Sequence, residues 1–170
     1  MSIKRCLLFA VVLFFLQSTL IPFLFDGVTQ PNVFFLAVIL IALQYGRKAG
    51  IVTAVVAGFV QDVVLSNFFG LHLIPYVILA AISSYIGRAG DKEQRILTVV
   101  TVLGATEVSL LLYCLMAFVS GQYVQPAAYM AEFAMPMTVY HLVLVLPAEY
   151  VVGKLRRQDS YYGYRRYYRP

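Results

Sequence analysis

Long apolar runs, separated by short polar or basic connections, make up most of this sequence. Hydrophobic residues account for 61% of the chain and charged residues for 12%, whereas a soluble domain typically carries about 25% charged residues. A small domain has too much surface for its volume to hide such an excess in a core. The sequence therefore predicts a membrane protein.

Each run is long enough, or nearly long enough, to cross a bilayer as a helix, which takes about 17 to 25 apolar residues. The six runs are Cys6–Phe25, Pro31–Tyr45, Ala49–Leu65, Gly70–Gly87, Ile96–Val119 and Ala128–Val152. The second has only 15 residues, so it crosses with little tilt, extends at one end, or is partly re-entrant. The predicted fold class is all-α, a polytopic membrane protein built as a six-helix transmembrane bundle.

The basic residues all fall on one side of this arrangement. The chain has 13 Lys and Arg, and none of them lies in the three connections 26–30, 66–69 and 120–127. Because cytoplasmic connections carry the excess of Lys and Arg, both termini are predicted to be cytoplasmic. The first run precedes no small-x-small cleavage site and is expected to remain as an uncleaved span.

The connections are too short to hold a folded domain outside the membrane. The sequence contains no GxxxxGK[ST], HExxH, CxxC or GxSxG motif, and no catalytic residue, metal or cofactor is predicted. Residues 1–153 are predicted to form one transmembrane domain, followed by a cytoplasmic tail over 154–170. The tail interleaves Tyr with Arg, which favours contact with anionic lipid headgroups over RNA binding. No nucleic-acid partner is expected.

A stripe of small residues marks the third run. Its members recur every four residues: Gly46, Gly50, Ala54, Gly58 and Asp62. Residues at this spacing share one helix face, and small side chains let a second helix approach closely. The stripe, together with Gly70, is interpreted as a packing seam with another helix of the chain or as a docking face for a partner's helix.

Seven polar side chains lie inside the runs or at their ends, where a charge is costly unless it is wet, protonated or hydrogen-bonded. They are Gln61, Asp62, His72, Glu107, Glu132, His141 and Glu149. By depth, the ionisable ones form an outer group (Asp62, His72, Glu132) and a deeper group (Glu107, His141, Glu149). Three interpretations are open: a proton or ion pathway, a substrate cavity that opens outward, and helix capping by hydrogen bonds.

Short motifs connect the middle of the chain to a known family. Pro31-Asn32 opens the second run, Gly50 and Gly58 lie in the third, Asp62 ends the third, and Gly70-Leu71 opens the fourth. In this stretch, residues 30–87, the chain resembles the bacterial rod shape-determining protein MreD family. The family has Asp or Asn after the proline, so Asn32 fits. Length, topology and the basic tail also agree.

The resemblance implies a non-catalytic subunit of the elongasome, the peptidoglycan synthesis machinery of the lateral cell wall, in the bacterial inner membrane. It implies binding to MreC, a single-span protein, and through it association with MreB, RodA and a transpeptidase. The family is also similar in architecture to the substrate-binding subunits of energy-coupling-factor transporters. The alternative function is therefore a small-molecule-binding subunit of such a transporter.

Overall fold

The computed structural model describes residues 3–25, 29–64, 69–89, 95–122 and 124–167 of the 170-residue chain. The side chains of residues 3–7 and 157–167 lie outside this description. Within the described residues every regular element is a helix. This confirms the predicted all-α class.

Six helical segments follow the six apolar runs. The first segment contains a π-helical turn and divides into α1 (Ile3–Phe15), η1 (Leu16–Leu20) and α2 (Ile21–Leu24). The others are α3 (Val33–Tyr45), α4 (Arg47–Val64), α5 (Leu73–Ala89), α6 (Arg95–Val119) and α7 (Pro126–Tyr167). The ends differ from the predicted ends by a few residues, except at α7.

The central helix of the bundle is α3. It packs against α1, α4, α5, α6 and α7, and ten of its 13 residues are buried. A helix that is apolar on all sides is suited to such a position. At about 1.5 Å per residue, α3 is about 20 Å long, shorter than the hydrocarbon core of about 30 Å. The shortest predicted run is therefore an enclosed helix that does not span the core by itself.

The small residues of α4 lie inside the bundle. Gly50, Ala54, Gly58 and Asp62 are all buried. A Cβ atom on Gly50 would lie 2.6 Å from the Ala42 Cβ of α3, and one on Gly58 would lie 2.5 Å from the Leu73 Cα of α5. The stripe is thus in contact with two helices of the same chain.

The opposite face of α4 points outward and is apolar. Its exposed residues are Val52, Val55, Val56, Phe59 and Val63. Monomeric soluble proteins rarely expose a contiguous apolar surface of this kind, whereas a bilayer requires it. Exposed apolar side chains on α1, α6 and α7 extend the same pattern.

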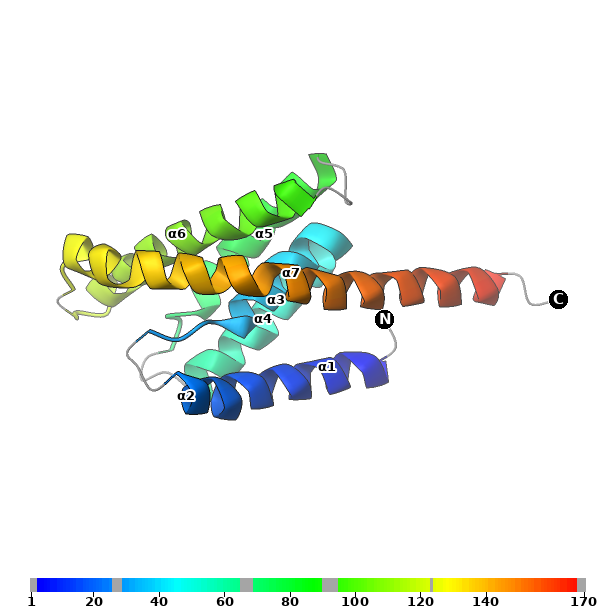
Figure 1. The fold of residues 1–170 in the computed structure, drawn as a ribbon, viewed down its shortest axis with the longest axis horizontal. Coiled ribbons are helices and arrows are strands. Elements are labelled where there is room, and N and C mark those ends of the chain that lie inside the picture. Colours follow the sequence, from blue (N-terminus) through cyan, green and yellow to red (C-terminus); the bar gives the residue numbers. More distant parts are fainter. Residues whose placement is uncertain (1–2, 26–28, 65–68, 90–94, 123, 168–170) are drawn as a thin grey trace.

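Two helical stretches of the described residues are long and apolar enough to cross a membrane: Arg95–Val119 and Pro126–Arg156. Three more are apolar but shorter: Leu8–Leu24, Val33–Tyr45 and Leu73–Ala89. In Figure 1, α1 begins and α7 ends at the same end of the bundle, as an even number of crossings requires. Six crossings and the cytoplasmic side of both termini stay predictions.

The last helix continues well beyond the predicted end of the sixth run. α7 extends to Tyr167 and includes Pro136 and Pro147 in its interior. Figure 1 shows its final turns projecting past the other helices. The predicted boundary at residues 153 and 154 therefore coincides with no break in the helix. The side chains of the Tyr/Arg segment lie outside the described residues, so their contact with lipid stays a prediction.

Candidate functional site

Most of the motif residues gather at the end of the bundle where α3, α5 and α7 begin, here called the Asn32 end. In the predicted topology this is the outer side. Asn32 caps α3, because its Oδ1 accepts a hydrogen bond from the Phe35 N–H at 3.0 Å. Its Nδ2 donates to the Tyr76 hydroxyl at 2.7 Å, and that hydroxyl donates to Gln61 Oε1 at 2.6 Å. This buried chain of bonds joins α3, α5 and α4.

Gln17 attaches the first helical segment to the start of α3. Its Oε1 accepts from the Val33 N–H at 2.8 Å, and its Nε2 donates to the Pro31 carbonyl at 3.3 Å. Gln17 lies in the π-helical turn η1, a distortion that is frequent at functional sites. This role of Gln17 was not predicted, although a lone glutamine inside an apolar run is a usable signal.

Asp62 accepts hydrogen bonds from the backbone at the start of α5. Its Oδ2 accepts from the N–H groups of Gly70 at 2.8 Å and Leu73 at 3.0 Å. Its Oδ1 accepts from the His72 N–H at 2.8 Å and from the His72 Nδ1 at 2.9 Å. Gly70 has a φ of 98°, a conformation that a residue with a side chain rarely adopts. The buried carboxylate is thus fully hydrogen-bonded, in agreement with the capping interpretation.

His141 links α7 to α6 and α3. Its Nδ1 lies 2.8 Å from the Thr106 Oγ1, which gives its own proton to the Val102 carbonyl at 2.8 Å. Nδ1 is therefore the donor of that bond, while Nε2 accepts from the Asn32 N–H at 3.4 Å. These two roles define a neutral imidazole with its proton on Nδ1. The ring also stacks on Phe35, with centroids 5.3 Å apart.

The predicted polar groups come together only in part. Asp62 and His72 form a pair, but Glu132 is exposed on α7. The deeper residues each bond a threonine across the α6–α7 interface. Besides the His141–Thr106 bond, Thr138 donates to Glu107, and Thr98 donates to Glu149 at 3.0 Å. Within the described residues, no hydrogen bond joins Glu107, His141 and Glu149 to one another, so no proton pathway is visible there.

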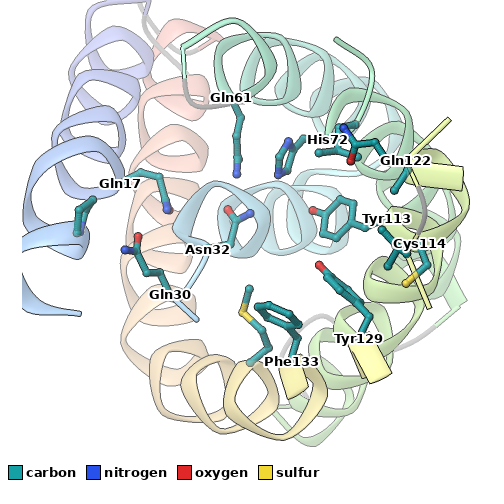
Figure 2. A pocket seen from close by; sticks show the side chains of 15 residues that line it. Gln17, Gln30, Asn32, Gln61, His72, Tyr113, Cys114, Gln122, Tyr129 and Phe133 are labelled. Atoms are coloured by element: carbon teal, nitrogen blue, oxygen red, sulfur yellow. The ribbon is translucent and has the colours of Figure 1, made fainter. Parts of the chain in front are cut away.

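A cavity of about 510 Å³ lies at the Asn32 end. Its lining comes from the first helical segment, α4, α6 and α7, and from the residues just before α3 and α5. Among the described residues, five carboxamides line it: Gln17, Gln30, Asn32, Gln61 and Gln122. His72, Tyr113 and Tyr129 add further polar groups. Figure 2 shows these side chains around the start of α3, with the Tyr113 and Tyr129 hydroxyls directed toward that helix end.

The cavity exists because α3 is shorter than the helices around it. α6, with 25 residues, is about 37 Å long, nearly twice the length of α3. The surrounding helices therefore continue past Asn32 and enclose a space on the axis of the bundle. An outward-opening cavity was one of the three interpretations of the sequence.

Replacing Asn32 by alanine is expected to lower the free energy of unfolding by about 2 kcal/mol. The change removes the α3 cap, worth about 1 kcal/mol, and the donor to the buried Tyr76 hydroxyl, whose loss costs a similar amount. Thermal unfolding of the purified full chain in detergent measures the effect. Asn32→Asp keeps the cap but lacks the donor to Tyr76, so about half of the loss is expected. Equal melting of Asn32→Ala and the unchanged chain would contradict this role.

Comparison with known proteins identifies the family. A family model for the rod shape-determining protein MreD matches residues 2–155, a range that includes Asn32, Asp62, Gly70 and the whole cavity lining. No curated protein and no solved structure matched the chain. The resemblance found in the sequence is thereby confirmed. The chain belongs to the MreD family of bacterial rod shape-determining membrane proteins.

Proposed function

We propose that this chain is a non-catalytic, multi-pass subunit of the cell-wall elongation machinery in the inner membrane, and that it binds the transmembrane helix of an MreC-type partner within the bilayer. The family match carries the proposal, because it extends over nearly the whole chain. Through that partner the chain would join MreB, RodA and a transpeptidase. The alternative function, a transporter subunit, has one observation in its favour, the cavity. The family match favours the rod-shape function.

An apolar groove of about 550 Å³ between α1, α3 and α7 is the surface best suited to the partner's helix. Residues of the two walls are Leu8, Val12, Leu16, Leu144, Ala148 and Val151, and the floor includes Leu36 and Ala37. Side chains that face an empty space lose dispersion contacts, so a second helix or lipid chains must fill this groove in a bilayer.

The groove is favoured over the two faces of α4. The small-residue face is already occupied by α3 and α5, as the contacts of Gly50 and Gly58 show. The outward face of α4 is a convex row of valines and Phe59. Membrane helices associate by close packing, and a concave apolar surface gives a partner helix more contacts than a convex one.

Replacing Ala148 by tryptophan should reduce the recovered complex at least fivefold, because the indole would fill the half-buried site in the groove. The measurement is affinity purification of the full chain co-expressed with its single-span partner, together with the shape of the cells. Val143→Trp is the matched control, because Val143 is 67% exposed on the same helix. Thermal unfolding of both variants tests the bundle itself.

The amount of partner recovered with each tryptophan variant identifies the docking face. Full recovery with Ala148→Trp and loss with Val56→Trp would place the partner on the outward face of α4, where Val56 is exposed. Full recovery with both variants would contradict docking on either surface.

A further inference from the structure

We infer that the cavity at the Asn32 end is a binding site for an uncharged small molecule that carries hydroxyl or amide groups. Its volume of about 510 Å³ lies within the range of about 300 to 1,000 Å³ that is usual for small-molecule sites. A bound molecule would touch the first helical segment, α4, α6, α7 and the residues just before α3 and α5.

Two polar groups of the lining have hydrogen-bonding capacity left. The Oε1 of Gln61 accepts from Tyr76, but its Nε2 makes no hydrogen bond within the described residues, and Figure 2 shows this nitrogen directed into the cavity. The Tyr113 hydroxyl is buried beside the Tyr76 hydroxyl and has no hydrogen bond of normal length and angle to another described residue. The neighbouring Tyr76 hydroxyl already bonds Asn32 and Gln61. A buried polar group without a partner is costly.

The carboxamides of Gln30 and Gln122 fit the same chemistry, whereas those of Gln17 and Asn32 already bond other groups of the bundle. A carboxamide both donates and accepts hydrogen bonds, and so does a tyrosine hydroxyl. A ligand with hydroxyl or amide groups, which also donate and accept, matches such a lining. Next to these groups, Tyr129 stacks on Phe133 with centroids 4.5 Å apart, and Leu71 and Met137 add apolar surface. The lining therefore suits a compact molecule with polar edges and a less polar face.

The described residues of the lining offer no counter-charge to an ion, because none of them is Lys, Arg, Asp or Glu. Two of the first N–H groups of α3 are already used, since Val33 donates to Gln17 and Phe35 donates to Asn32. The nearby Asp62 carboxylate accepts four hydrogen bonds. A charged ligand would lose its hydration without compensation, so the ligand class is uncharged.

Cys114 provides a chemical probe of entry, because it lines the cavity. In the full chain with Cys6→Ser, reconstituted in vesicles, uncharged 2-hydroxyethyl methanethiosulfonate should modify Cys114 at least tenfold faster than the anionic 2-sulfonatoethyl reagent. Both rates are normalised to the reaction with free cysteine. Equal rates would overturn the charge selectivity, and no reaction with either reagent would overturn the accessible site.

Cavity-filling variants test whether the probe enters through this space. Ala117→Phe fills the cavity from α6, and Met137→Trp fills it from α7. Both should slow the modification at least tenfold, while Val108→Phe, at an exposed position of α6, should not. Unchanged rates in variants that melt normally would mean that the reagent reaches Cys114 by another route.

Competition tests the ligand class directly. N-Acetylglucosamine, which is uncharged and carries hydroxyl and amide groups, should slow the modification of Cys114 at least fivefold, and its 6-phosphate should not. No protection by the uncharged sugar, or equal protection by both, would overturn the assignment. Recovery of the single-span partner with Ala117→Phe should be normal, so failure of the ligand proposal is distinguishable from failure of the proposed function.

Discussion

Replacing Asp62 by alanine is expected to lower the free energy of unfolding by at least about 3 kcal/mol. The change removes the acceptor for three backbone N–H groups, of Gly70, His72 and Leu73, and for the His72 imidazole. Each buried donor left without a partner costs about 1 to 3 kcal/mol. The negative charge also stabilises the start of α5 through the helix dipole.

Circular dichroism during thermal unfolding in detergent measures this effect on the purified chain. Glu132→Ala is the matched control, because Glu132 is an exposed acid near the same end of the bundle and its loss should leave the midpoint unchanged. Asp62→Asn keeps the shape but has one acceptor oxygen instead of two, so an intermediate loss is expected.

The Asp62 variants also decide between capping and a proton pathway. A capping carboxylate predicts that stability and function fall together. A pathway predicts that Asp62→Asn and Glu107→Gln both abolish function in a normally assembled protein. Normal melting of Asp62→Ala would contradict the capping role.

Replacing Gly58 by leucine is expected to cost about 3 kcal/mol or more, or to prevent accumulation of the folded chain. A Cβ at this position would lie 2.5 Å from the Cα and 3.0 Å from the backbone nitrogen of Leu73. Overpacking usually costs about 1 to 3 kcal/mol, and here the obstacle is backbone, which cannot rotate away. The α4 and α5 helices would have to separate.

Gly104→Leu on α6 is the matched control, because a Cβ there meets no atom within 4 Å. It should be neutral or slightly stabilising, since leucine is the better helix former. Yield and melting in detergent measure both variants. If Gly58→Leu melts normally but loses the partner, the stripe is a docking face after all. If both are normal, the close contact of α4 with α5 contributes nothing measurable.

The sequence by itself determined which residues form helices. Apolar runs, glycines and basic connections are local signals, because a bilayer imposes a length and an apolar character on each span independently of its neighbours. The predicted starts and ends of the helices therefore agree with the structure to a few residues, except that α7 extends to Tyr167 and the predicted end was Val152. The family also followed from local motifs, Pro31-Asn32 and Gly70-Leu71 among them.

The tertiary structure alone decided how the polar side chains meet. Asn32 pairs with Tyr76, and His141 pairs with Thr106, and in each case the two residues come from different helices. Their contact depends on the rotation and axial position of each helix, which a periodic pattern within one run does not specify. Tyr76 and Tyr113 were therefore missed, and the grouping by depth did not specify that Asp62 pairs with His72 while Glu132 is exposed.

The cavity likewise depends on how the helices are placed relative to one another. The sequence showed that the run beginning at Pro31 is short, but it left open whether that helix crosses with little tilt, extends at one end or is partly re-entrant. The packing of the longer helices around α3 decides the outcome. α3 begins only after Asn32, and a polar space of about 510 Å³ remains on the bundle axis beyond that residue. A space of this kind is a property of several helices together, and no single stretch of the chain encodes it.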